Sequence, residues 1–293
     1  MFQYKRILVP LDGSRRAETA LLPALLLSKA FSAEITLLRV VPTLKLVAPF
    51  VQVELSSKEA QADHKRQASN YLKGLRMVNK EEGVVMKTAV STGRAAAGII
   101  QYAQENETDL IVLASHGGTG MGRWRYGEIA MKLLLSAPCS TLVVRSDDDH
   151  QPLQFKRIMI PLDGSEEAER AIEPTTAIAT QMDAEIIMVR VTAPIQKAVG
   201  VENAKAFASQ IKNQVERYLQ TVRKRFEGTQ ATINTQVESG PVAQSILTYA
   251  QDDQIDLIAL TAHGASGEEA VSPLGGVADK VLRGAKQAVM IIR

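Results

Sequence analysis

The chain has 293 residues, of which 45% are hydrophobic and 23% are charged, so it holds enough apolar side chains to form globular cores. This length favours two domains over one. The net charge of +2 lacks the excess of Lys and Arg that a nucleic-acid-binding surface needs, so we expect no nucleic-acid partner.

Short apolar runs alternate with helical patterns along the first half of the chain. The runs are RILVPL, EITLLRVV, VVMKTAV, LIVLAS and STLVVR, and helical periodicity falls at roughly 15–30, 55–80, 94–106 and 126–136. Near-continuous apolar strands separated by helices indicate a parallel sheet covered on both faces. Five strands and four helices therefore predict one doubly wound α/β domain.

A polar segment, RSDDDHQPLQ at 145–154, follows the last of these runs. Its three aspartates and its proline are typical of a solvated connection. We expect a linker over about 147–153, between a first domain at 1–146 and a second domain at 154–293.

The second half of the chain repeats the first. KRILVPLDGS at 5–14 returns as KRIMIPLDGS at 156–165, an offset of 151, and DLIVLASHG at 109–117 returns as DLIALTAHG at 256–264, an offset of 147. The strands of this copy are expected at RIMIPL, EIIMVRV, INTQVES, LIALTA and AVMIIR. Two tandem domains of one fold are thus predicted, and the loss of four residues between about 40 and 70 indicates a shortened connecting loop.

Single residues also recur between the copies. Pro23 and Pro174 occupy the same place in the first helix of each copy, where a proline is expected to kink or weaken the helix. Two further residues recur: Arg39 returns as Arg190 at the offset of 151, and Tyr71 returns as Tyr218 at the offset of 147.

The location of the protein follows from what the sequence lacks. Lys5 and Arg6 precede any apolar stretch, which argues against a secretory signal, and no uncharged run approaches the length of a membrane span. Cys139 is the single cysteine and has no partner for an internal disulfide. We expect a cytoplasmic protein without a membrane segment.

Two carboxylates mark the place where a ligand is expected. In an open parallel sheet, ligands bind beyond the carboxyl ends of the strands where the strand order reverses. Asp12 and Asp163 follow the first strand of each copy, and a carboxylate there can accept hydrogen bonds from a ribose hydroxyl or a base amine. The alternative is a simple turn, with Ser14 and Ser165 capping the next helix.

The loop HGGTGMGRWRYGE, at 116–128, follows the fourth strand of the first copy. Glycines allow backbone N–H groups to approach an anion closely, and the helix that follows adds its positive end. His116 and His263 precede the loop glycines, and we interpret both as turn residues rather than metal ligands. Trp124 is expected to pack against a helix or a partner, with stacking on a base as the alternative.

The combination of ILVPLDGS with ASHG…GEIAMKLL…APCSTLVVR resembles the universal stress protein family, and the whole chain resembles a tandem pair of such domains. The resemblance implies a Rossmann-like fold of the adenine nucleotide alpha hydrolase type. It also implies that the last strands of the two domains, STLVVR and AVMIIR, lie side by side in an internal pseudo-dimer, with association into a homodimer as a further option. The protein partner is left unknown.

In nucleotide-binding members of this family, a Gly-x2-Gly-x9-Gly-(Ser/Thr) motif holds the phosphates of ATP, and an Asp after the first strand touches the nucleoside. The first copy departs from this motif twice, because an alanine replaces the first glycine and a glutamate replaces the hydroxyl residue. The second copy also lacks the hydroxyl, and its loop is one residue longer. The candidate residues for binding ATP or another adenine nucleotide are Pro10, Asp12, Val40, Ala114, Gly117, Gly127 and Glu128 in the first copy and Pro161, Asp163, Val191, Thr261, Gly264, Gly275 and Gly276 in the second.

Charge favours the first copy for an anionic ligand, although Glu128 itself should repel a terminal phosphate. As a residue of the first helical turn, that glutamate can alternatively serve the helix dipole. The bordering loops carry charges of opposite sign in the two copies: Arg15, Arg16, Arg123 and Arg125 in the first, and Glu166, Glu167, Glu268 and Glu269 in the second. We expect one nucleotide at most, bound in the first copy.

Three functions are compatible with these residues. The leading interpretation is a stress-response protein that acts by binding, with an adenine nucleotide in the first copy and no catalysis, because the sequence offers no evident nucleophile with a neighbouring base. A slow nucleotide hydrolase is the second. The third is a regulatory, partner-binding module in which both pockets are degenerate, as the missing hydroxyl residues suggest.

Overall fold

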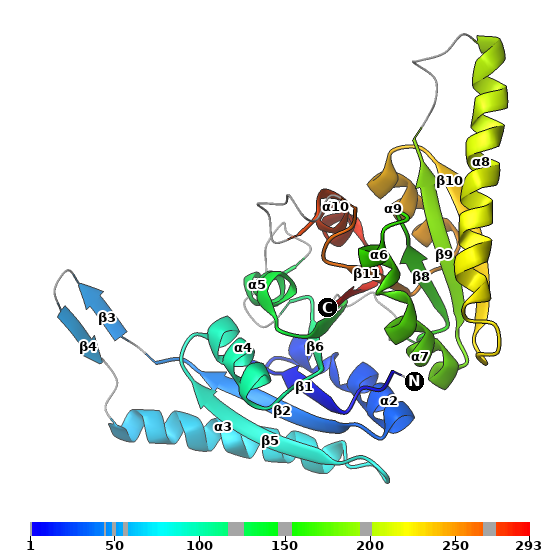
Figure 1. Ribbon diagram of the computed structural model, residues 1–293. Helices are drawn as coiled ribbons and strands as arrows, with labels where there is room; N and C mark the ends of the chain where they lie inside the picture. The colour runs from blue at the N-terminus through cyan, green and yellow to red at the C-terminus, as the bar shows by residue number, and fades with distance from the viewer. Residues whose placement is uncertain are drawn as a thin grey trace. The chain divides into compact units, whose positions relative to one another are not determined.

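The computed structural model describes residues 2–43, 45–48, 51–54, 58–116, 126–145, 154–193, 201–265 and 274–293, with the backbone alone over 45–48, 51–54 and 201–205. The chain divides into two compact units, which we call the N-terminal unit, Tyr4–Pro152, and the C-terminal unit, Leu153–Arg293 together with Met1–Gln3. Each unit is an α/β domain of its own (Figure 1).

The N-terminal unit is built on a parallel sheet in the order β5-β2-β1-β6-β7. Its central strands are almost wholly buried, as the apolar runs require of a sheet with two covered faces. The strand order reverses between β1 and β6, which places a ligand crevice at the carboxyl ends of these strands. The strands are β1 (Arg6–Pro10), β2 (Glu34–Val41), β5 (Met86–Thr92), β6 (Leu110–Ala114) and β7 (Ser140–Val144).

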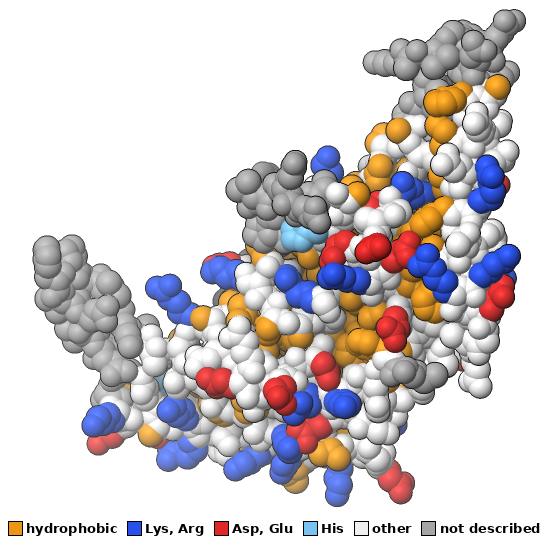
Figure 2. Space-filling view, in the orientation of Figure 1, with side chains coloured by type: hydrophobic (Ala, Val, Ile, Leu, Met, Phe, Trp, Pro, Cys, Tyr) orange, Lys and Arg blue, Asp and Glu red, His pale blue; other side chains and the backbone are white. Residues whose placement is uncertain are grey.

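Helices cover both faces of this sheet, with α2 and α3 on one face and α4 and α5 on the other (Figure 1). The doubly wound five-stranded domain predicted from the sequence is thereby confirmed. Figure 2 shows that positive and negative side chains alternate over the visible face of this unit, so charge of one sign does not gather there. The helices are α1 (Arg15–Glu18), α2 (Leu21–Phe31), α3 (Lys58–Val78), α4 (Ala95–Glu105) and α5 (Glu128–Ser136).

The C-terminal unit repeats this arrangement, with the parallel order β10-β9-β8-β11-β12. No helix among the described residues of the chain is long and apolar enough to cross a bilayer. The expected pairing of STLVVR with AVMIIR, and any homodimer, stay predictions. The elements are β8 (Arg157–Pro161), β9 (Glu185–Thr192), β10 (Thr232–Ser239), β11 (Leu257–Thr261), β12 (Ala288–Ile292), α6 (Glu166–Glu169), α7 (Ile172–Met182), α8 (Val201–Lys224), α9 (Val242–Asp252) and α10 (Gly276–Gly284).

The shared prolines are accommodated by a break in the first helix. A single helix over roughly 15–30 was expected, but α1 ends at Glu18 and α2 begins at Leu21, so Pro23 lies in the first turn of α2. A residue of the first turn has no intrahelical acceptor for its N–H, and a proline there therefore removes no hydrogen bond. Pro174 takes the same position in α7.

The four-residue difference between the copies indicated a simple connecting loop between β2 and α3, but this segment contains further structure. It forms an antiparallel hairpin of β3 (Lys45–Ala48) and β4 (Val51–Glu54). In the C-terminal unit the offset of 147 maps Glu54 onto Val201, where α8 begins. The length difference between the two copies therefore falls at this hairpin and leaves both sheets intact.

Candidate functional site

A tight turn after β1 positions Asp12. The Oδ1 atom of Asp12 accepts hydrogen bonds from the backbone N–H of Ser14 at 2.9 Å and from its Oγ at 2.6 Å. The Ser14 Oγ in turn accepts from the N–H of Ala17 at 3.2 Å and caps α1. The same turn therefore both caps α1 through Ser14 and fixes the position of the Asp12 carboxylate.

Gly13 makes this turn possible for two reasons. Its φ of +86° lies in the left-handed region, which side chains with a Cβ rarely adopt. A Cβ at this position would also lie 2.9 Å from Nη1 of Arg39. Gly164 repeats both features in the C-terminal unit, with a φ of +85° and a distance of 3.2 Å to Nη1 of Arg190.

The glycine-rich loop is closed at its base by a backbone hydrogen bond. Gly127, the residue before α5, donates its N–H to the carbonyl of Ser115 at 2.7 Å, and a Cβ there would come within 3.4 Å of the same oxygen. Gly275 donates in the same way to Ala262 at 2.8 Å. Several candidate residues lie outside the described residues: Gly117, Arg123, Trp124, Arg125, Glu268 and Glu269.

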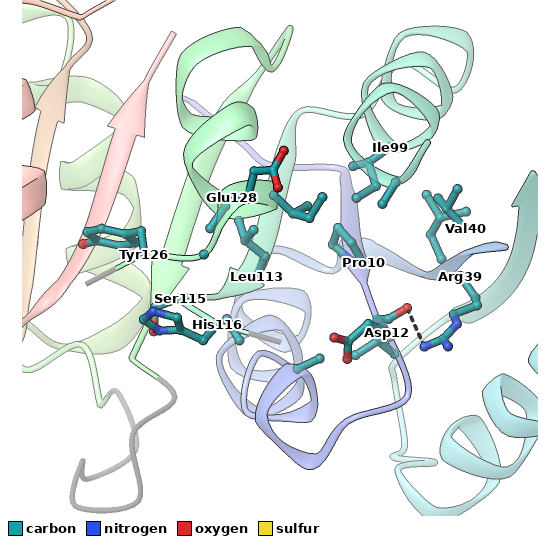
Figure 3. Close-up of a pocket in the computed structure, with 18 of the residues that line it drawn as sticks. Pro10, Asp12, Arg39, Val40, Ile99, Leu113, Ser115, His116, Tyr126 and Glu128 are labelled. Carbon is teal, nitrogen blue, oxygen red and sulfur yellow. Dashed lines mark hydrogen bonds between the residues drawn. The ribbon is translucent and has the colours of Figure 1, made fainter. Parts of the chain in front are cut away.

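A pocket of about 600 Å³ opens at the carboxyl ends of β1, β2 and β6, where the strand order reverses (Figure 3). Its walls are apolar, with Leu38, Ile99 and Leu113 among them, while Asp12 lies at one end and the start of α5 at the other. We call it the first pocket. Of the candidate residues, it brings together Pro10, Asp12, Val40, Ala114, Gly127 and Glu128.

Four polar residues of the first pocket were not among the sequence candidates. Ser115 is fully buried, and its Oγ lies 3.3 Å from Nδ1 of His116, the residue interpreted as part of a turn. Tyr126 packs its ring 5.7 Å below the guanidinium of Arg145 as the chain enters α5. In the sequence, Arg39 stands out only because it recurs as Arg190. That recurrence is the one signal that could have indicated a role for Arg39 in the site. All four line the pocket: Arg39, Ser115, His116 and Tyr126.

Glu128 begins α5 at the mouth of the first pocket, and its side chain is exposed. Lys132, one turn along the helix, lies 2.5 Å from its carboxylate. This hydrogen bond and the charge of the lysine hold the pKa of Glu128 below its usual value, so the group stays ionised at neutral pH. The lysine balances part of the charge that was expected to repel a phosphate.

The matching pocket of the C-terminal unit, which we call the second pocket, is smaller, at about 240 Å³. Asp163 repeats the turn of Asp12, since its Oδ1 accepts from the N–H of Ser165 at 3.0 Å and from its Oγ at 2.5 Å. Its Oδ2 accepts a further hydrogen bond from the N–H of Ala265 at 2.7 Å. The candidates lining this pocket are Pro161, Asp163, Val191, Thr261, Gly264, Gly275 and Gly276.

The loop after β11 approaches Asp163 so closely that a Cβ on Gly264 would collide with Oδ2. Burial alone would raise the pKa of Asp163, but hydrogen bonds from Ser165 and Ala265, together with the charge of Arg190, bring the pKa below its usual value. Both oxygens of this carboxylate are therefore bonded within the protein.

A polar network beside the Asp-Gly-Ser turn recurs in both units. In the N-terminal unit, Arg39 donates from Nη1 to the carbonyl of Leu11 at 3.4 Å (dashed in Figure 3) and lies 6.0 Å from the ring centre of Tyr71. Tyr71 donates its hydroxyl to Glu18 at 2.8 Å. Burial, followed by this carboxylate, raises the pKa of Tyr71 well above its usual range. In the C-terminal unit, Tyr218 donates to Glu169 at 2.9 Å.

Three comparisons relate the chain to known proteins. The model of the universal stress protein family matches residues 3–145 and 154–293. A universal stress protein of Methanocaldococcus jannaschii is 31% identical over 144 residues, which are 48% of this chain and 82% of the relative. Another from Bacillus subtilis is 29% identical over 147 residues, 48% of this chain and 99% of the relative.

A solved structure has the same fold over the full length of the chain. A universal stress protein from Archaeoglobus fulgidus aligns with 100% of this chain and 99% of its own, with a TM-score of 0.71 at 18% sequence identity. Two tandem domains of one fold are therefore shared with that protein.

Proposed function

The chain belongs to the universal stress protein family, and from this premise we propose that it acts in the stress response by binding one adenine nucleotide, ATP, ADP or AMP, in the first pocket. We place this activity in the cytoplasm and assign no catalysis to the chain.

The first pocket carries the proposal. Its volume of about 600 Å³ falls within the range of small-molecule sites. The carboxylate of Asp12 can accept hydrogen bonds from ribose hydroxyls or a base amine, and apolar walls next to it suit a base. At the other end, the first residues of α5 offer their backbone N–H groups and the positive end of a nine-residue helix to a phosphate.

The second pocket supports a stoichiometry of one. At about 240 Å³, it has less than half the volume of the first. Divergence of the two copies has thus left one pocket suited to a nucleotide.

The hydrogen bonds of Ser14 favour binding over hydrolysis. Ser14 carries the hydroxyl group nearest to Asp12 along the chain. Its Oγ donates to Asp12 and accepts from Ala17, so both interactions fix it as a helix cap. A nucleophilic serine needs a base that accepts its proton with the oxygen directed at a substrate. In the part of the chain that the structure describes, no group of three or more His, Cys, Asp or Glu residues could hold a metal ion.

Calorimetric titration with ATP, ADP and AMP tests the proposal on the full chain and on Asp12→Asn. Asparagine keeps the Oδ1 acceptor of the turn and removes the carboxylate charge, so we expect binding to weaken by roughly tenfold without loss of folding. Asp163→Asn is the matched control and should leave the affinity unchanged.

Absence of heat with all three nucleotides would contradict the proposal and favour the partner-binding alternative. Equal losses in the two variants would contradict the assignment to the first pocket. Release of phosphate from ATP above background, lost in Asp12→Asn, would establish the hydrolase alternative instead.

A further inference from the structure

A second hollow lies beside the Asp12 turn, between the end of β2 and α3. It has a volume of about 350 Å³. We call it the lateral pocket, and its walls include Gly13, Arg39, Pro42, His64, Gln67 and Tyr71. Arg39 also lines the first pocket, so one guanidinium borders both cavities.

The helix α3 supplies one wall of the lateral pocket from a single face. His64, Gln67 and Tyr71 lie three and four residues apart, the spacing that aligns side chains along a helix. The imidazole and the amide are exposed and each provides N–H donors, while the ring of Tyr71 is half-buried. The tyrosine proton is already donated to Glu18.

Arg39 brings a positive charge to this hollow and uses little of its hydrogen-bonding capacity. A guanidinium carries five N–H donors. Among the described residues, Arg39 donates one hydrogen bond, to the carbonyl of Leu11 at a long 3.4 Å, and its guanidinium lies over the ring of Tyr71. No carboxylate among the described residues forms an ion pair with it. The nearby Glu18 accepts the proton of Tyr71.

We propose that the lateral pocket binds a phosphate-sized anion, held by Arg39 with donors from His64 and Gln67. Because Arg39 faces both cavities, the anion is carried by the ligand of the first pocket, a nucleotide with a second, separate phosphate. This part of the inference rests on the function proposed for the first pocket. Planar guanidinium groups are well suited to phosphate oxygens.

The C-terminal unit lacks part of this donor set. The offset of 147 places Ile211 where the N-terminal unit has His64, whereas Gln214 and Tyr218 match Gln67 and Tyr71. An isoleucine offers no donor to an anion. The site therefore belongs to the N-terminal unit, and Gln214 serves as a matched control position.

Calorimetry compares AMP with adenosine 2′,5′- and 3′,5′-bisphosphate, and inorganic phosphate is titrated into the full chain with and without saturating AMP. We expect a bisphosphate to bind roughly five- to tenfold more tightly than AMP, as one charge-assisted contact allows. The double variant His64→Ala, Gln67→Ala should lose most of this gain, because only Arg39 still holds the anion, and should keep its affinity for AMP. Gln214→Ala should keep both.

The two sources of the anion give different results: either supports a lateral anion site, but only the gain with a bisphosphate supports its assignment to the nucleotide of the first pocket. Saturable binding of inorganic phosphate that the double variant weakens would identify a free anion; a gain limited to a bisphosphate would identify the nucleotide. Neither effect in the wild-type chain, or effects of unchanged size in the double variant, would overturn the inference. Failure of AMP to bind contradicts only the proposed function, because the phosphate titration without AMP still tests the lateral pocket.

Discussion

Asp12 and Asp163 occupy equivalent turns in the two units. Both follow the first strand of their unit, and both accept hydrogen bonds from the serine two residues later. The sequence predicted this turn because Asp-Gly-Ser appears twice. It could not predict the N–H of Ala265 on Asp163, since that contact depends on how a loop 102 residues away folds back.

The bonded state of Asp163 makes stability depend on pH. Its pKa is lower in the folded chain than the ordinary 3.8, so its stabilising contribution is present above 3.8 and is lost as pH falls through the folded value. We expect Asp163→Asn to lower the free energy of unfolding by about 1 kcal/mol at neutral pH. In urea denaturation the difference from wild type should vanish below the folded pKa. A difference independent of pH would contradict this.

The turn at Gly13 is expected to be intolerant of a side chain. Gly13→Ala combines a left-handed φ with a Cβ 2.9 Å from Arg39, and the backbone cost alone is about 1–2 kcal/mol. Gly83→Ala is the matched control, because Gly83 has a φ of +79° and a Cβ added there would meet no other atom within 4 Å. Denaturation should show a larger loss for Gly13→Ala. Equal losses would mean that the contact with Arg39 has no energetic weight.

At the scale of elements, the strands and most helices followed from the sequence. Each apolar run of the first copy became a strand, and the helix expected at roughly 55–80 spans Lys58–Val78. The hairpin of β3 and β4 was missed because two four-residue strands carry little periodic signal and pair only with each other. The sequence does not predict the break between α1 and α2, because Pro23 indicates a kink in one continuous helix rather than the start of a second one.

The start of α5 is expected to set the preference among nucleotides in the proposed site. Glu128 places a negative charge where the family motif has a hydroxyl, and Lys132 balances part of it. We expect Glu128→Ser to strengthen binding of ATP by roughly threefold or more and to change AMP binding less, because repulsion grows with phosphate charge. Gly276→Ser in the C-terminal unit is the control. The gain, measured by calorimetry, should shrink at high salt. Equal gains for ATP and AMP would refute this role for Glu128.

For the whole molecule, the internal repeat predicted two units of one fold, and the structure confirms them. The sequence also predicted that a phosphate would prefer the first copy, on the basis of loop charges. Of those charges, Arg15, Arg16, Glu166 and Glu167 lie in α1 and α6. The unequal volumes of the two pockets favour the same copy for another reason, which composition and charge do not encode.

The number of adenine nucleotides bound per chain at saturation tests the account most directly. It can be measured by calorimetry with ATP on the wild-type protein after denaturation and refolding have removed any ligand retained from the cell. The account predicts one nucleotide per chain, held in the first pocket and weakened by Asp12→Asn. Two nucleotides per chain would contradict the assignment of binding to the first pocket alone, and none would contradict nucleotide binding itself.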